Sequence, residues 1–191
     1  FADRLVDAVR RKRSVVVVGL DPRLDLLPAE LRLRHGAAPD RPAAAARANL
    51  AFNKKVIDAI APHAVAVKPQ SAFYEVYGHE GVAAFEATCA HAADRGLLVI
   101  ADVKRGDVPD TAEAYARAYL GSPAAPVDAI TVNPLFGRDG TEPFLKAASP
   151  ALIEVMGYAG LDFALLDMEH GPVSYELLEH MILAAERVGL A

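Results

Sequence analysis

The sequence predicts an α/β fold built from parallel βαβ units. Short β-branched runs recur along the 191 residues, and each is followed by a longer stretch whose apolar residues have helical spacing. Continuous apolar runs such as 15–18 are typical of strands covered on both faces, as in a parallel sheet. Polar residues gather where these strands end, and parallel α/β folds place their ligand sites there. An open doubly wound sheet and part of a (βα)8 barrel both fit this pattern, because periodicity alone does not choose between them.

Each element has its own local signal. The candidate strands are Val15–Leu20, Ala64–Lys68, Leu97–Asp102, Asp128–Asn133 and Phe163–Asp167. Leu50–Ile60 places Phe52, Val56 and Ile60 on one helical face, and Ser174–Val188 has the same periodicity. These stretches predict amphipathic helices that cover a sheet.

Capping and loop residues predict where other elements begin and end. Asp110, three residues before Glu113, is expected to cap a helix that stops at Gly121. His35–Ala46 has prolines, a glycine and alanines without an obvious period, and it is expected to be a long surface loop. The basic run 10–13 is expected to end a first helix, where cations complement the helix dipole.

Composition and charge exclude several classes of protein. Hydrophobic residues make up 53% of the chain, which is too apolar for a disordered linker. A net charge of −5 supplies no general field for nucleic acid, so any anion must be held by a local cluster of donors. No apolar run approaches the roughly 20 residues that span a bilayer, and Phe1–Arg13 does not resemble a signal peptide, so a cytoplasmic location is expected. Cys89 is the sole cysteine and is expected to be buried and unreactive.

Four of the candidate strands end at or beside a charged or amide residue. These residues are Asp21, Lys68, Asp102 and Asn133. The densest segment is 102–107, with the sequence Asp-Val-Lys-Arg-Gly-Asp, in which strand alternation places Asp102 and Lys104 on one side. Gly106 is expected to allow a sharp turn after them.

This array has a specific chemical use. A lysine held between carboxylates stays an ammonium ion, so Lys104 could donate a proton to a carbanion but would be a poor amine nucleophile. The pattern therefore disfavours a Schiff-base aldolase. The alternative is that Asp102, Lys104 and Asp107 form a structural network of ion pairs.

Four motifs resemble the orotidine 5′-phosphate decarboxylase family, in that family's order and over about residues 1–148. They are Gly19-Leu20-Asp21-Pro22, Val67-Lys68-Pro69-Gln70-Ser71-Ala72-Phe73, Ala101-Asp102-Val103-Lys104-Arg105-Gly106-Asp107 with Thr111 and Ala112, and Thr131-Val132-Asn133-Pro134. The Asp-x-Lys-x-x-Asp element is the most specific of them. The resemblance implies a (βα)8 TIM-barrel fold and a carboxy-lyase of pyrimidine nucleotide biosynthesis that uses no metal or organic cofactor.

The resemblance also assigns a role to each matching residue. It implies that Asp21 holds the ribose and that Lys68 bridges the ribose and the charge network. Asp102 would lie against the substrate carboxylate, and Lys104 would protonate C6 as carbon dioxide leaves.

A shared active site is a further implication. In a homodimer, Asp107 and Thr111 would reach into the partner subunit's active site, and Asn133 would contact substrate. Open sheet edges on a fragment with about five βα units also favour association.

Residues 149–191 resemble a different family, the metal-dependent pyruvate aldolases of the HpcH/HpaI type. Their Glu169-His170-Gly171-Pro172 element implies an acid–base role for His170. The later strands that hold phosphate in the decarboxylases are not found, and Gly137–Gly140 is expected to be a plain turn. The sequence thus predicts an incomplete or chimeric barrel, with a decarboxylase-like part (1–148) and an aldolase-like part (149–191). A metal-dependent aldolase using His170 and a non-catalytic scaffold are the alternative functions.

Overall fold

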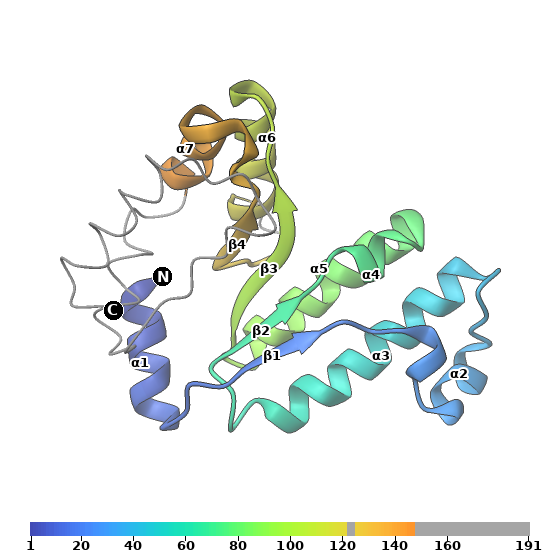
Figure 1. Ribbon diagram of the computed structural model, residues 1–191. Coiled ribbons are helices and arrows are strands. Elements are labelled where there is room, and N and C mark those ends of the chain that lie inside the picture. The colour runs from blue at the N-terminus through green and yellow to red at the C-terminus, as the bar shows by residue number, and fades with distance from the viewer. Residues whose placement is uncertain (122–124, 148–191) are drawn as a thin grey trace.

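The computed structural model describes residues 1–121 and 125–147, in which four parallel strands form one sheet (Figure 1). The strands are β1 (Val17–Leu20), β2 (Ala66–Pro69), β3 (Leu98–Arg105) and β4 (Ala129–Val132). The α-helices are α1 (Ala2–Lys12), α2 (Ala29–His35), α3 (Pro42–Ile60), α4 (Ala72–Glu75), α5 (Gly78–Asp94), α6 (Pro109–Leu120) and α7 (Gly137–Ala147). Two short 3-10 turns, η1 (Leu24–Leu26) and η2 (Pro134–Phe136), follow β1 and β4.

The strand order selects between the two predicted architectures. The strands lie in the order β1-β2-β3-β4, which is their order along the chain, and each pair is parallel. A doubly wound sheet reverses its strand order at a switch point, whereas a (βα)8 barrel adds each strand beside the previous one. The described sheet therefore has barrel topology.

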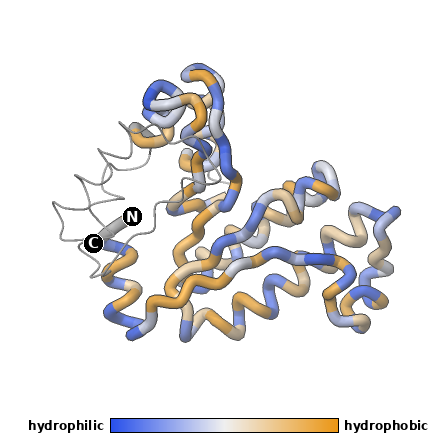
Figure 2. Tube along the Cα trace, viewed as in Figure 1, coloured by the Kyte–Doolittle hydropathy of each residue, from blue (hydrophilic) through white to orange (hydrophobic). Residues whose placement is uncertain are grey.

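The two faces of β3 have different environments. Val99 and Val103 join the large core that includes residues of α3 and α5, while Leu98 and Ile100 pack with α1 on the other face. Asp102 continues the face of Leu98 and Ile100 by strand alternation. The polar residues begin where β3 nears its carboxyl end, as the change of colour along this strand shows in Figure 2.

The long loop predicted at His35–Ala46 is wrong for most of its length. His35 ends α2, α3 begins at Pro42, and only residues 36–41 connect them. Ala44, Ala45 and Ala46 are buried. Their small side chains let the first turns of α3 pack closely against the rest of the protein. A search for periodically spaced large apolar residues does not detect a helix that is buried through alanines.

The buried face of α3 also differs from the predicted one. Phe52, Val56 and Ile60 are only partly buried, and the fully buried stripe contains Asn53 and Ile57. The amide of Asn53 donates to the hydroxyl of Tyr74 at 2.8 Å, inside the core. A buried asparagine is tolerated when its amide has a hydrogen-bond partner inside the protein. The polarity of Asn53 therefore did not indicate which face of α3 is buried.

Three local predictions need correction. Val15 and Val16 are 73% and 50% exposed, so the apolar run 15–18 is not covered on both faces, and β1 has only β2 as a neighbour in the described sheet. Asp110 is not the N-cap, because Val108 precedes the first helical residue. The predicted turn at 137–140 is the first turn of α7.

Other predictions are confirmed. The basic residues 10–12 lie in the last turn of α1. Cys89 is fully buried, and burial raises the pKa of its thiol to about 12, which leaves it protonated and unreactive at neutral pH. None of the helices in the described ranges has the length and hydropathy to cross a membrane. The predicted strand Phe163–Asp167, the predicted helix Ser174–Val188 and His170 lie outside the described residues.

Candidate active site

The carboxylate of Asp102 is the centre of a charged cluster at the carboxyl ends of β2 and β3. Lys68 Nζ lies 2.6 Å from Asp102 Oδ2, and Lys104 Nζ lies 2.6 Å from Asp102 Oδ1. The Asp102 side chain is 6% exposed, while those of Lys68 and Lys104 are 37% and 62% exposed. Two ammonium groups that reach solvent thus flank one buried carboxylate.

Two neutral side chains complete the environment of this carboxylate. Gln70 Nε2 donates to Asp102 Oδ2 at 3.1 Å, and Thr131 Oγ1 donates to Asp102 Oδ1 at 2.8 Å. Burial by itself raises the pKa of Asp102, but the hydrogen bonds from Lys104, Lys68 and Thr131 outweigh it and lower the pKa to about 2. Asp102 is therefore a fixed negative charge at neutral pH.

The backbone at Lys104 has an unusual conformation. Its φ is +45°, in the left-handed region that residues with a side chain rarely adopt, and the pairing of β3 with β4 shifts register between Ala101 and Arg105. The amides of Val103 and Lys104 both donate to Thr131 Oγ1, at 3.1 and 2.9 Å. Thr131 thus holds the irregular end of β3 and the Asp102 carboxylate with the same hydroxyl group.

The cluster confirms that Asp102, Lys104 and Lys68 come together, and it narrows the two positions that the sequence left open for Asp107. Asp102 and Lys104 do share one side of β3, and Lys68 lies beside them. However, no ion pair joins Lys104 to Asp107 within the described residues, and the Asp107 carboxylate accepts from the Val108 amide at 2.8 Å. Instead of one lysine between two carboxylates, the structure has one carboxylate between two lysines.

The remaining predicted residues are not among the hydrogen-bond partners of Asp102. Asp21 and Thr111 are exposed, after β1 and in the first turn of α6. Asn133 is exposed after β4, and its side chain accepts from the Leu135 amide at 3.0 Å. Because all four strands are parallel, the residues after β1 and β4 lie at the same edge of the sheet as the cluster.

Gly106 is required for a reason other than the predicted sharp turn. A Cβ atom on Gly106 would lie 2.4 Å from the backbone oxygen of Asn133. Its φ is not in the left-handed region, so close approach of β3 and β4 is what excludes a side chain there.

Sequence reasoning missed two members of the cluster, Gln70 and Thr131. Both stand in the motifs described above, without an assigned role. Gln70 lies two residues after Lys68, and this spacing places it on the same face of an extended chain. For Thr131 the only local signal is a hydroxyl residue near the end of a strand, and that signal does not identify its partner.

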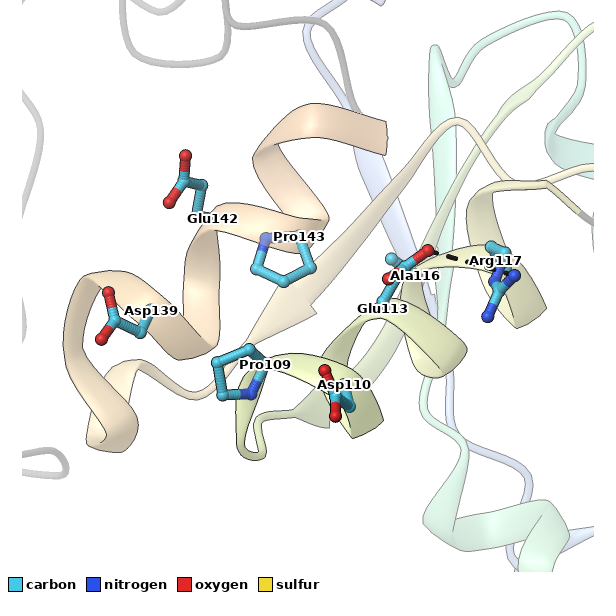
Figure 3. A pocket seen from close by; sticks show the side chains of 8 residues that line it. All are labelled: Pro109, Asp110, Glu113, Ala116, Arg117, Asp139, Glu142 and Pro143. Atoms are coloured by element: carbon cyan, nitrogen blue, oxygen red, sulfur yellow. Dashed lines mark ion pairs between the residues drawn. The ribbon is translucent and has the colours of Figure 1, made fainter.

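A separate hollow of about 450 Å³ lies between α6 and α7 (Figure 3). Its walls carry the acidic residues Asp110, Glu113, Asp139 and Glu142, and Arg117 pairs with Glu113 at 4.0 Å. None of the predicted site residues lines it.

In the described ranges no three His, Cys, Asp or Glu side chains are placed to hold a metal ion.

Comparisons with known proteins identify the family. A family model described as the orotidine 5′-phosphate decarboxylase/HUMPS family matches residues 14–170. An orotidine 5′-phosphate decarboxylase from Rhodopirellula baltica is 45% identical over 152 residues, covering 76% of this chain and 49% of the relative. One from Haloarcula marismortui is 39% identical over 185 residues, covering 95% and 62%. The structure of Leishmania donovani OMP decarboxylase aligns with a TM-score of 0.58 and 33% identity, over 74% of this chain and 49% of that one.

The chain thus spans about half to three fifths of the length of these curated relatives. The family match continues to residue 170, into the part predicted to be aldolase-like, and the relatives named here are decarboxylases, so the predicted aldolase-like part finds no support in them. The fold is accordingly of the TIM-barrel α/β type, with four of its strands in the described residues. Because the family model matches most of the chain, the chain belongs to the orotidine 5′-phosphate decarboxylase/HUMPS family.

Proposed function

We propose that the chain is an orotidine 5′-phosphate decarboxylase-type lyase whose reacting groups are Lys104, Asp102 and Lys68. The observation that carries this proposal is the buried Asp102 carboxylate between two partly exposed ammonium groups, each 2.6 Å away. The sheet edge there offers fixed cations to an anionic substrate, despite the net charge of −5.

The chemistry follows from the placement of these charges. A substrate carboxylate bound near Asp102 is repelled by that fixed negative charge, and loss of carbon dioxide relieves the repulsion. The bond from C6 to the carboxyl carbon breaks, and its electron pair stays on C6. Lys104 Nζ then delivers a proton to C6 and regains one from water. The preorganised ammonium groups supply the positive charge for this step, so the proposed reaction calls for no metal or organic cofactor.

The substrate-binding residues belong to the same edge of the sheet. In the proposal Asp21 binds the ribose hydroxyls, Lys68 links the ribose to the charge network, and Asn133 faces the pyrimidine side. The exposed positions of Asp21 and Asn133 support this role, with the Asn133 oxygen already accepting from the Leu135 amide and its amide nitrogen left as the group for a ligand. Because remote binding energy holds the reacting centre in place, a weak grip on the substrate phosphate would lower turnover as well as affinity.

The experiment is carbon dioxide release from carboxyl-labelled orotidine 5′-monophosphate by the full chain. We expect Lys104→Ala to lower the rate about 10²–10⁴-fold, the usual contribution of a positioned proton donor. Lys55→Ala, at an exposed lysine of α3, is the matched control and should keep the rate.

Three outcomes would overturn the proposal. Full activity of Lys104→Ala would remove Lys104 from the reaction. Activity that disappears with a chelator would favour the metal-dependent aldolase chemistry predicted for His170. Calorimetry without saturable heat from the nucleotide would identify a non-catalytic scaffold.

We also propose a homodimer with shared active sites. Asp107 makes no ion pair with Lys104 of its own chain in the described residues, and Thr111 is exposed on the first turn of α6, so both are available to a second copy. Mixing inactive Lys104→Ala and Asp107→Ala chains should then restore up to about a quarter of the wild-type rate, through mixed dimers with one intact site. A monomer in light scattering, or no recovery on mixing, would contradict this arrangement.

A further inference from the structure

Arg105 directly follows Lys104 and is held between two helices at the end of β3. Its NH2 group lies 2.5 Å from Glu75 Oε1, on α4, and donates to the Tyr119 hydroxyl, on α6, at 3.2 Å. Its guanidinium carbon lies 5.4 Å from the ring centre of Tyr115 and 5.8 Å from that of Tyr119. The Arg105 side chain is 26% exposed, so most of it is packed. We call these four side chains, Glu75, Arg105, Tyr115 and Tyr119, the arginine clamp.

The clamp is attached next to a strained residue. A left-handed backbone costs a residue with a side chain about 1–2 kcal/mol, so the φ of +45° at Lys104 needs support from its surroundings. At Lys104 itself and at the residue before it, Thr131 accepts hydrogen bonds from the amides of Val103 and Lys104. At the residue after Lys104, the Arg105 carbonyl accepts from the Asn133 amide at 2.8 Å, and the Arg105 side chain is held in the clamp.

The other end of the clamp is connected to Asp102. Glu75 ends α4, and the residues just before α4 bind Asp102 directly. Gln70 donates to the Asp102 carboxylate at 3.1 Å, and the Ser71 amide donates to the Asp102 carbonyl at 3.1 Å. The ion pair between Arg105 and Glu75 therefore joins the segment that orients Asp102 to the residue that follows Lys104.

We propose that Arg105, through the clamp, is a positioning residue that sets where the Lys104 ammonium lies relative to the Asp102 carboxylate. The clamp does not touch the reacting atoms. It fixes the backbone at Lys104, whose flexible side chain would otherwise start from a variable origin. The significance of this placement for catalysis rests on the proposed function, but the placement itself is a property of the folded chain.

The geometry requires an arginine at this position. A planar guanidinium stacks on aromatic rings while its N–H groups remain directed at oxygen acceptors, and an ammonium group does not combine these two contacts in the same way. Arg105→Lys should keep the attraction to Glu75 but not the simultaneous reach of one guanidinium to Glu75 and the Tyr119 hydroxyl, and should be only partly functional.

The test measures local opening at Lys104 without using turnover. Hydrogen exchange followed by NMR should show the Lys104 and Val103 amides exchanging about tenfold faster in Arg105→Met than in the wild type, the scale of one lost charge-assisted hydrogen bond. Arg95→Met is the matched control, because Arg95 Nε pairs with Asp58 at 2.6 Å between α5 and α3, away from the strand ends. It should leave the exchange of both amides unchanged.

A catalytic readout separates positioning from general stability. If the chain decarboxylates, Arg105→Met should lower kcat more than it raises KM, since it displaces the proton donor and leaves the binding groups in place. Arg105→Lys should recover part of kcat, and Arg95→Met should keep the wild-type value. If Arg105→Met does not fold, Glu75→Gln breaks the same ion pair from the α4 side and should raise the exchange of the same amides.

The outcomes distinguish this inference from the proposed function. Unchanged exchange at Lys104 in a folded Arg105→Met or Glu75→Gln protein would overturn the clamp, whatever the activity. Equal acceleration of all slowly exchanging amides would also overturn it, because it would mean a structural role only. A wild-type chain without decarboxylation would refute the proposed function, while faster exchange confined to Lys104 and Val103 in Arg105→Met would still support the clamp.

Discussion

Asp102 and Asp58 are both carboxylates that contact two basic side chains, in very different surroundings. Asp102 lies between Lys68 and Lys104 at the end of the sheet, with a side chain 6% exposed. Asp58 lies on the outer surface of α3, 47% exposed, with Arg95 Nε at 2.6 Å and His91 Nε2 at 2.8 Å, both from α5. The distances to the basic side chains are similar, so the two sites differ in burial and in the two further donors, Gln70 and Thr131, that Asp102 has.

Burial changes what the same pattern does. At Asp58 the hydrogen bonds from Arg95 and His91 lower the pKa of a carboxyl group that water already solvates, and the group joins two helices. At Asp102 burial opposes ionisation, and the surrounding donors must overcome it before they lower the pKa to about 2. Removing one partner of a buried ion pair lowers the stability of the fold strongly, because the other charge stays buried without a counter-ion. Removing one partner of an exposed pair has a small effect, because water solvates the charge that remains.

The largest expected effect is the contrast between Asp102→Asn and Asp58→Asn. Asp102→Asn leaves Lys68 and Lys104 without their shared counter-ion, and we expect a loss of about 3 kcal/mol in the free energy of unfolding. This is the low end for removing one partner of a buried ion pair, because both lysines reach water. Asp58→Asn should change the midpoint of urea unfolding much less. Equal shifts in the two variants would show that burial does not govern the difference.

The pH dependence gives the next largest effect. The pKa of Asp102 is lowered to about 2, so its stabilising contribution is complete above the unfolded value of about 3.9 and is lost as the pH falls through about 2. Urea unfolding of wild type and Asp102→Asn at several pH values should give free energies whose difference narrows by about 2 kcal/mol between pH 5 and pH 2. A difference that stays constant over this range would contradict the lowered pKa.

The smallest effect concerns the hydroxyl that supports Asp102. Thr131→Val keeps the shape of the side chain but removes one donor to Asp102 and the acceptor of two amides, at a cost of about 1–2 kcal/mol. Thr88→Val is the matched control, since the Thr88 hydroxyl donates to the Ala84 carbonyl within its own helix at 2.7 Å. Only Thr131→Val should also accelerate exchange of the Lys104 amide, measured by NMR. If Thr88→Val accelerates exchange of the Lys104 amide equally, the effect of Thr131→Val comes from a general loss of stability and not from its hydrogen bond to that amide.

Errors of the sequence analysis have a common physical origin in contacts between distant residues. The loop predicted up to Ala46 failed because buried alanines pack without a pattern of large apolar residues. The buried face of α3 was predicted at Phe52, Val56 and Ile60 and not at Asn53, whose partner Tyr74 is 21 residues away. For Asp107 the sequence left two positions open, beside Lys104 or against a second subunit, and within its own chain its carboxylate accepts from the Val108 amide.

The sequence by itself determined the parallel βαβ arrangement, the polar ends of the strands and the family to which the motifs point. It also determined that Asp102 and Lys104 share a side, because strand alternation is a property of adjacent residues. Only the tertiary structure decided that Gln70 and Thr131, 32 and 29 residues from Asp102, complete its environment, and that Arg105 joins α4 to α6. Those contacts depend on the register between strands and on how helices pack over them. Neither the strand register nor the helix packing is encoded by the residues that are neighbours in the sequence alone.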